Sequence, residues 1–143
     1  MSNRRYVLIS PCRDEAEHAP HARKCHGTER PVDDGSTDDT PAILESYRPR
    51  MPYLRVVRRA NRGRGSVAVI EAFYAGLETV TLEDFDYVCK LDLDLPRRYF
   101  ELLLIMARMD ANPRLGTTSG KPYFIAPGNR NLVAEVCGGE IRV

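Results

Sequence analysis

The feature that most constrains the fold is an alternation of short apolar runs with amphipathic segments. Residues 6–10 and 87–91 are apolar runs typical of buried parallel strands. Helical patterns are predicted at 40–47, from Ser66 onward and from Pro96 onward. Because strands that alternate with helices form parallel sheets with helical layers, the order predicts an α/β fold with a mostly parallel sheet flanked by helices.

Further elements complete this alternation. Additional extended elements are predicted at 54–57, 115–119, 121–124 and 132–136, with a turn at 127–129 before the last, which would make it the return strand of a hairpin. Pro11 is expected to end the first strand, and Asn112-Pro113 the last helix. The apolar faces of the two later helices are predicted to consist of Ile70, Phe73, Tyr74, Leu77, Phe100, Leu103, Leu104 and Ala107.

The segment between residues 16 and 31 fits the alternation poorly. A helix could start near Glu15, but Pro20 interrupts it and Gly27 breaks any continuation. Of the apolar strand expected before Asp33, only Val32 remains. Two explanations are open: the strand is very short, or residues between about 18 and 32 are missing from the chain.

An acidic turn comes directly after this segment. Gly35 permits a sharp change of chain direction, and Thr40-Pro41 has the composition of an N-cap followed by a first helical residue. A turn that aims two carboxylates and is followed by a helix N-terminus suits a polar or metal-bound ligand. The carboxylates of the turn belong to Asp33, Asp34, Asp38 and Asp39.

A second acidic element comes after the apolar run at 87–91. Strand alternation places Asp92 and Asp94 on the same side of the chain. Hard divalent cations such as Mg²⁺ and Mn²⁺ prefer oxygen ligands and often take one or two protein carboxylates together with substrate phosphates. A polar loop at 12–15 ends the first strand, and there Arg13 and Glu15 either contact a substrate or pair with each other.

Length and charge limit the class of protein. The 143 residues favour a single domain over 1–143, and a net charge of +1 argues against a nucleic-acid-binding protein. No run is long and apolar enough to span a bilayer, and no signal peptide is recognisable, so the expected location is the cytoplasm or the inner face of a membrane as a peripheral protein. Reduced thiols are expected for the widely spaced Cys12, Cys25, Cys89 and Cys137.

Two clusters have weaker interpretations. The first is either a solvated loop or an anion-binding loop, and it contains Arg58, Arg59, Arg62 and Arg64. The second has residue types that bind zinc, but their spacing fits no common ligand pattern, so a polar surface is the favoured interpretation. It contains His18, His21, Cys25 and His26.

Together these segments resemble a family 2 glycosyltransferase with the Rossmann-like GT-A nucleotide-sugar-binding fold. The resemblance extends over about residues 6–120. It rests on the sequences at 9–15 and 32–40, on Asn61-Arg62-Gly63 before a helix, and on the Asp-x-Asp strand end at 90–96.

The resemblance implies a function and a set of site residues. The chain would take part in moving a hexosyl or related sugar from a UDP- or GDP-sugar to a glycan, lipid or protein acceptor. Arg62 or a neighbouring arginine would reach the pyrophosphate, and Asp94 would hold Mn²⁺ or Mg²⁺ on the diphosphate. Asp34 would lie close to the base, Glu15 near the ribose, and Asp92 beside the ribose and sugar. The residues of the nucleotide-sugar site would be Pro11, Arg13, Glu15, Asp33, Asp34, Arg62 and Asp92.

One expected residue has no clear counterpart. Inverting members of the family carry a general base well after the Asp-x-Asp motif, but the only acids after Gly120 are Glu135 and Glu140, and surface charge is the favoured interpretation of both. The chain therefore resembles the donor-binding half. The alternative is a non-catalytic module that binds a nucleotide or metal. A nucleotidyltransferase is disfavoured because residues 11–15 contain no glycine-rich phosphate loop.

Overall fold

The computed structural model of the chain describes two compact units, Met1–Tyr99 and Phe100–Val143. The expectation of one domain over 1–143 stays a prediction. The residues that the structure describes are 4–24, 27–60, 66–94, 99–118, 123–126 and 130–133.

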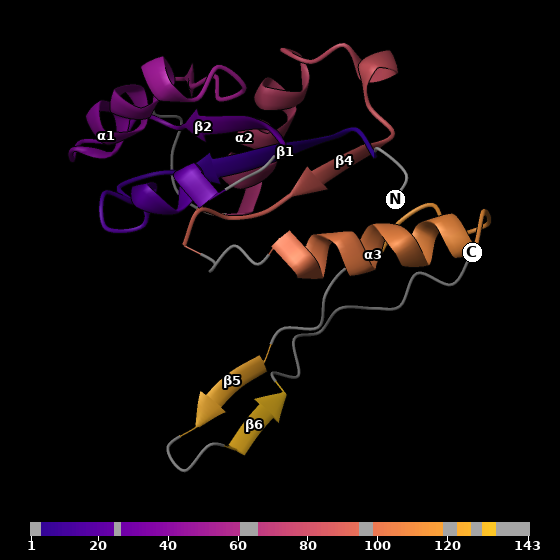
Figure 1. Cartoon of the computed structure of the whole chain (residues 1–143). Helices are drawn as coiled ribbons and strands as arrows, with labels where there is room; N and C mark the ends of the chain where they lie inside the picture. The colour runs from indigo at the N-terminus through magenta and orange to yellow at the C-terminus, as the bar shows by residue number, and fades with distance from the viewer. Residues whose placement is uncertain are drawn as a thin grey trace. The chain divides into compact units, whose positions relative to one another are not determined.

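The first unit is built on a four-stranded parallel sheet (Figure 1). Its strands are β1 (Tyr6–Cys12), β2 (Thr28–Asp33), β3 (Val57–Arg58) and β4 (Tyr87–Lys90). They lie in the order β3-β2-β1-β4, so β1 is central and is paired on both sides. This arrangement confirms the predicted α/β fold with a mostly parallel sheet.

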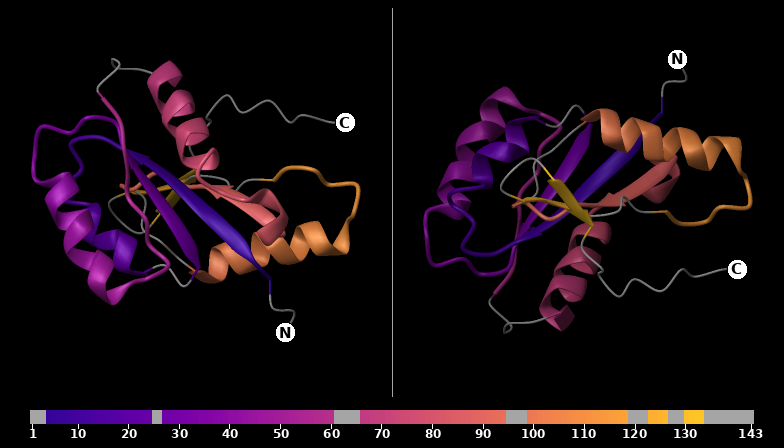
Figure 2. Two further views of the ribbon diagram at one scale, coloured as in Figure 1. Left: turned by 90° about the horizontal axis from the view of Figure 1, so that it is seen from above. Right: turned by 90° about the horizontal axis from the view of Figure 1, so that it is seen from below.

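Helices cover both faces of this sheet. The α-helices are α1 (Thr40–Tyr47) and α2 (Ser66–Leu77), both at predicted positions. Seen from above and below, α1 and α2 lie on opposite sides of the sheet (Figure 2). Short 3₁₀ helices occupy η1 (Ala19–Lys24), η2 (Arg48–Arg50) and η3 (Leu82–Asp84).

Each face of the sheet has its own apolar core. The core on the α1 side contains Cys12, Ala19, Ala22, Leu44, Met51, Leu54 and Leu93. The core on the α2 side contains Val7, Ile9, Val32 and Ala72. Gly76 brings α2 close to the sheet, because a Cβ at this position would lie 2.7 Å from a methyl carbon of both Ile9 and Val32.

The first strand continues through Pro11, contrary to the prediction. The pairing of β1 with β4 stops at Ile9 and Lys90, and the Ile9 carbonyl accepts the last hydrogen bond, from the Leu91 N–H. The backbone groups of Pro11 point toward β4, as those of Ile9 do, because alternate residues of a strand face the same neighbouring strand. Its missing N–H therefore faces a position where no β4 residue remains to be paired.

The second strand is six residues long, so the first of the two open explanations, a very short strand, does not hold. Its sequence is polar, yet Glu29 and Arg30 are buried. The backbone of the strand is paired with the next segment: the Glu29 N–H donates to the Tyr53 carbonyl at 3.1 Å, and the Glu29 carbonyl accepts from the Arg55 N–H at 3.0 Å. Burial lowers the pKa of Arg30, and nearby Arg55 lowers it further. Residues 25 and 26 of the preceding connection lie outside the described residues, so the hypothesis of missing residues stays a prediction.

The third strand is shorter than predicted. Regular pairing is confined to Val57–Arg58, and Leu54 forms only an isolated bridge to Glu29. The residues between have no strand pairing, so the predicted strand at 54–57 is mostly irregular backbone.

The apolar face of α2 also differs from the prediction. Phe73 and Leu77 pack against the core, but Ile70 and Tyr74 are 54% and 58% exposed. The reason is that the buried stripe of this helix is made of small residues, including Ala72, which allow a close approach to the sheet. The hydrophobic periodicity predicted the helix correctly, but it assigned the larger apolar side chains to the buried face instead of this stripe of small residues.

The second unit contains most of α3 (Tyr99–Ala111) and a hairpin. The helix ends before Asn112-Pro113, as predicted. Leu104, which was predicted to lie on the apolar face, is 70% exposed, whereas Met106 is buried.

The hairpin pairs β5 (Tyr123–Ala126) with β6 (Arg130–Val133) in antiparallel register, which confirms the predicted return strand slightly earlier in the chain. Residues 115–118 form no strand, contrary to the prediction, because they pair with no described segment. Ser119 and the predicted turn at 127–129 lie outside the described residues. Within the described parts of the chain, none of the helices combines the length and apolar character needed to cross a membrane.

Candidate functional site

An open pocket of about 380 Å³ lies at the carboxyl ends of β1 and β4. Its walls are residues 11–15, Asp34, residues 92–94 and three residues of α2, Ala68, Val69 and Ala72. The strand order reverses here, since β2 and β3 follow β1 on one side and β4 joins on the other. Ligands bind at such a reversal in open α/β sheets, and the volume is within the range of small-molecule pockets.

The structure brings together most of the predicted site residues. Pro11, Arg13, Glu15, Asp34, Asp92 and Asp94 all line this pocket. They come from three strand ends that are distant in sequence and adjacent in the sheet. Arg62 lies outside the described residues. The individual roles implied by the resemblance stay predictions.

Asp14 joins the loop after β1 to the loop after β2. Its Oδ1 accepts hydrogen bonds from the Thr37 N–H at 2.7 Å and the Thr37 hydroxyl at 3.2 Å, while its own N–H donates to the Ser36 hydroxyl at 2.9 Å. The hydrogen bond from the Thr37 backbone holds the pKa of Asp14 below its usual range. Asp14 has a φ of 51°, a left-handed conformation that Asp tolerates better than most residues.

Thr40 makes a second link between these loops. The expected N-cap bond is absent: Asp39 is the N-cap of α1 and its side chain makes no capping bond. Instead, the buried Thr40 hydroxyl accepts from the Glu15 N–H at 2.7 Å. Asp38 accepts from the Thr40 N–H at 2.9 Å and, with its other oxygen, from the Ala16 N–H at 3.0 Å. The start of α1 is therefore fastened to the backbone that carries Glu15.

Asp33 and Asp34 have different surroundings. Asp33 accepts a hydrogen bond from the Ser36 N–H at 3.1 Å and is not among the described residues that line the pocket. Gly35, which follows Asp34 and precedes α1, adopts a φ of 73°, as its position in a sharp turn requires. Asp34 lines the pocket, and its side chain lies 3.4 Å from the Nη1 of Arg59.

Arg59 is a neighbour of Asp34 to which the sequence analysis gave no role. Its side chain is only 11% exposed, and its guanidinium also lies 3.2 Å from Glu71 of α2. Of the other three clustered arginines, Arg58 is exposed, and Arg62 and Arg64 lie outside the described residues. No local pattern distinguishes Arg59 from Arg58, because the pairing with Asp34 depends on the neighbouring strand.

The two carboxylates of the Asp-x-Asp motif differ in their contacts. The Lys90 ammonium lies 2.6 Å from Asp92, whereas no described residue forms a hydrogen bond or ion pair with the exposed Asp94. Among the described residues, no group of three or more potential metal-binding side chains is assembled. One or two carboxylate oxygens are the usual protein share of a Mg²⁺ site that also uses substrate phosphates. The donor set therefore fits a hard divalent cation shared with a diphosphate.

The two described histidines of the zinc hypothesis have other partners. The Nδ1 of His18 lies 2.7 Å from a carboxylate oxygen of Glu15, and the Nδ1 of His21 lies 3.3 Å from the carbonyl oxygen of Leu93. Cys25 and His26 lie outside the described residues. The spacing of His18 three residues after Glu15 was a usable signal for the first contact, but the second joins distant segments.

Comparison with known proteins agrees with this geometry. Residues 31–124 match the family described as glycosyl transferase family 2. The mannosyltransferase PcManGT from Pyrobaculum calidifontis, solved with GDP-Man and Mn²⁺, has a TM-score of 0.63 at 23% identity, over 80% of this chain and 35% of that one. S. aureus TarS 1-349 has a TM-score of 0.59 at 21% identity, over 76% of this chain and 33% of that one.

These similarities define the fold and the family. The chain spans about a third of the length of both solved structures, and it has the sheet and helices of their GT-A fold. No curated protein matches it in sequence at a significant level. Because the family match covers more than half of the 143 residues, the chain belongs to glycosyl transferase family 2.

Proposed function

We propose that this chain binds a nucleoside-diphosphate sugar together with Mn²⁺ or Mg²⁺, as the donor-binding half of a glycosyltransferase. The observation that carries the proposal is the meeting of Asp34, Glu15 and Asp94 in one pocket at the reversal point of the sheet. Membership of family 2 supports the reaction class.

Each wall of the pocket has chemistry suited to one part of such a donor. The carboxylate of Asp34 can accept an N–H of a uracil or guanine base, and that of Glu15 can accept ribose hydroxyls. Asp94 is the residue that would hold the divalent cation. When bound, the cation would offset the negative charge that grows on the departing phosphate oxygen. The remaining task of these side chains is to position the donor.

The donor is proposed to be a UDP- or GDP-sugar carrying a hexose or related sugar. The GDP-Man and Mn²⁺ held by PcManGT support this choice. The acceptor is proposed to be a glycan, lipid or protein. Glu135 and Glu140, the acids that remain for a general base late in the chain, lie outside the described residues.

Titration calorimetry of the full chain with UDP and GDP tests the binding step. We expect one of them to bind, and to bind more tightly with MnCl₂ than with EDTA. A second assay incubates the chain with UDP- and GDP-sugars and Mn²⁺ and measures release of the nucleoside diphosphate. Binding without release on a range of acceptors supports the non-catalytic module, whereas failure to bind either nucleotide contradicts the proposal.

A further inference from the structure

The connection between β1 and β2 contacts both walls of the pocket. It contains η1, which includes His21 and is directly preceded by His18: the His21 N–H donates to the His18 carbonyl at 2.8 Å, and the ring centroids are 5.8 Å apart. His18 contacts Glu15, on the wall assigned to the nucleoside. His21 contacts Leu93, on the wall assigned to the metal.

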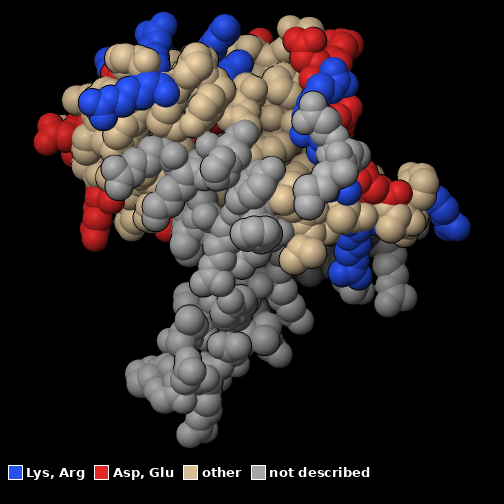
Figure 3. Space-filling view, viewed as in Figure 1, with Lys and Arg blue, Asp and Glu red and all other residues tan. Residues whose placement is uncertain are grey.

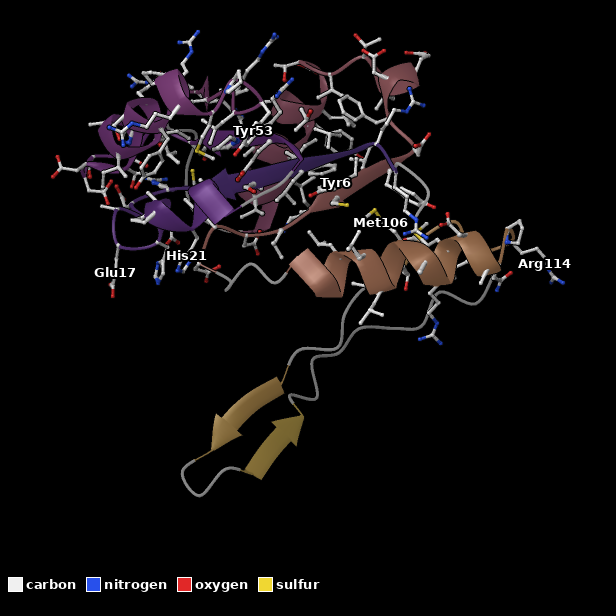
Figure 4. All side chains as sticks on the ribbon, in the orientation of Figure 1. Tyr6, Glu17, His21, Tyr53, Met106 and Arg114 are labelled. Carbon is white, nitrogen blue, oxygen red and sulfur yellow. The ribbon has the colours of Figure 1, made fainter. Side chains whose placement is uncertain are left out.

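Leu93 is anchored in two ways. Its side chain is 1% exposed and belongs to the same buried cluster as Ala19 and Ala22 of η1. Its carbonyl oxygen lies 3.3 Å from the Nδ1 of His21, so that the ring donates when Nδ1 carries the proton. Figure 4 shows His21 on the side of η1 where the chain leaves β4.

This anchoring matters because of what stands on either side of Leu93. Asp92 is held by Lys90, the last residue of β4, and Asp94 has no partner among the described residues. The position of Asp94 therefore depends on the peptide group that precedes it, and the oxygen of that peptide group is the acceptor for His21. A metal ligand displaced by a fraction of an ångström loses affinity, so a contact to its own peptide group is significant.

We propose that His21 is a positioning residue that holds Asp94 in place for the divalent cation, and that His18 does the same for Glu15 on the nucleoside wall. The proposal rests on the proposed function and adds two residues to it. It predicts separable effects, because each histidine contacts one wall of the pocket.

The first test is titration calorimetry of the full chain with UDP and GDP, each with MnCl₂ and with EDTA. His21→Ala should reduce the Mn²⁺-dependent gain in nucleotide affinity by roughly 10- to 100-fold, the range typical of residues that orient metal ligands, while affinity in EDTA stays the same. His18→Ala should weaken binding in EDTA and preserve the ratio between the two conditions. Equal losses in both conditions for both variants would overturn the proposal.

Conservative variants distinguish the effect of losing the hydrogen bond from the effect of losing side-chain volume. His21→Asn places an amide nitrogen near the position of Nδ1 and should restore most of the Mn²⁺ effect. His21→Gln places its nitrogen nearer the position of Nε2 and should not. A result in which Asn and Gln behave alike would contradict a role for the Nδ1 contact. Thermal unfolding of each variant identifies losses that come from destabilisation.

A measurement without nucleotide or metal keeps this proposal distinct from the proposed function. The Leu93 carbonyl and the Asp94 nitrogen share one peptide group, so loss of the His21 bond should shift the Asp94 amide ¹⁵N resonance, and His21→Asn should return it toward the wild-type position. An unchanged Asp94 resonance in His21→Ala overturns the positioning role. If the resonance shifts but the wild-type chain binds neither nucleotide, the proposed function fails while the contact stands.

Discussion

Asp14, Asp33 and Asp38 use their carboxylates to accept backbone N–H groups, whereas Asp34 and Asp94 present theirs to the pocket. The first group shapes the loops, and the second is available for chemistry. A run of acids that appears uniform in sequence therefore has two roles. Only the hydrogen-bond partners distinguish them.

Asp94→Asn tests the open carboxylate. The amide keeps the shape of the side chain but lacks the negative charge, so we expect Mn²⁺-dependent nucleotide binding to fall by about 100-fold or more, since even residues behind a metal ligand account for 10- to 100-fold. Calorimetry with and without Mn²⁺ measures the effect. The exposed Asp84 provides the matched control, because Asp84→Asn should change neither value. Unchanged Mn²⁺ dependence in Asp94→Asn would remove Asp94 from the metal site.

Asp34→Asn tests the buried carboxylate beside Arg59. Hydrogen bonds to charged groups contribute about 1.5–3 kcal/mol, so UDP or GDP binding should weaken by about tenfold or more, both with and without metal. Glu71→Gln removes the negative charge of the other carboxylate beside Arg59 and should leave nucleotide affinity nearly unchanged. If Asp34→Asn binds as tightly as wild type in calorimetry, the carboxylate serves only its ion pair.

Sequence reasoning at this scale identified the acidic corners and could not identify their neighbours. Asp34 and Asp94 are recognisable because motif spacing and strand ends are local properties. Arg59 and His21 are not, since each acts on a residue from a distant part of the chain. Such contacts depend on which strands are neighbours in the sheet.

At the scale of elements, the start of α1 and the loop after β1 form one unit through Thr40. Thr40→Val keeps the size of the side chain but leaves the Glu15 N–H without its acceptor, which should destabilise the protein by about 1–3 kcal/mol. Urea unfolding measures this loss. Thr40→Ser retains the hydroxyl and is the control; it should lose less than Thr40→Val. The opposite order would show that the methyl group, not the hydrogen bond, matters.

The approach of α2 to the sheet depends on Gly76. Ala is the better helix former by up to about 1 kcal/mol, but its Cβ would overlap stiff, branched side chains of Ile9 and Val32. We expect Gly76→Ala to destabilise the protein by about 1–3 kcal/mol in urea unfolding. Gly116→Ala is the control, since an added Cβ meets nothing within 4 Å there. A stabilised Gly76→Ala variant would mean that helix propensity outweighs the overlap.

Elements with strong periodicity were predictable, and those supported by their neighbours were not. The apolar run of β1 and the helical pattern of α2 can be recognised from the local sequence alone. The sequence Thr-Glu-Arg-Pro-Val-Asp of β2 does not, because backbone bonds to adjacent segments hold the strand despite its polar side chains. The exposed apolar residues of α2 were assigned to the core because a small-residue stripe has little hydrophobic signal.

At the scale of the whole molecule, formal charge is nearly balanced, with 21 Lys and Arg against 20 Asp and Glu. On the face in Figure 3, basic side chains gather at the upper left of the described surface and an acidic group lies at the upper right. The clearest long-range ion pair joins Arg5, before β1, to Asp86, before β4, at 2.9 Å. The Asp86 N–H also donates to the Arg5 carbonyl, so this contact fixes the amino ends of the two strands together.

Acid should destabilise the protein through such contacts. The hydrogen bond from the Arg5 side chain holds the pKa of Asp86 below its usual range, and the Thr37 backbone does the same for Asp14. A carboxyl with a lowered folded-state pKa adds stability above its unfolded pKa, near 4, and that stability is lost as pH falls through the folded value. Urea midpoints at pH 7, 5 and 3 should therefore decrease mainly between 5 and 3.

Asp86→Asn supplies the control for this pH dependence. It should lower the urea midpoint at pH 7 and reduce the further loss at pH 3, since one of the titrating groups is gone. An identical pH dependence in the variant and the wild type would show that the Arg5–Asp86 pair makes no contribution to acid sensitivity.

The short connection between β1 and β2 has a consequence for the order of assembly. Only residues 13–27 must close before these two strands pair, whereas β4 reaches the same central strand after a loop of residues 13–86. Because the entropy of closing a loop rises with its length, the β1–β2 pair should nucleate first and β4 should dock late. The nucleoside half of the cleft would thus exist in a folding chain before its partner half arrives.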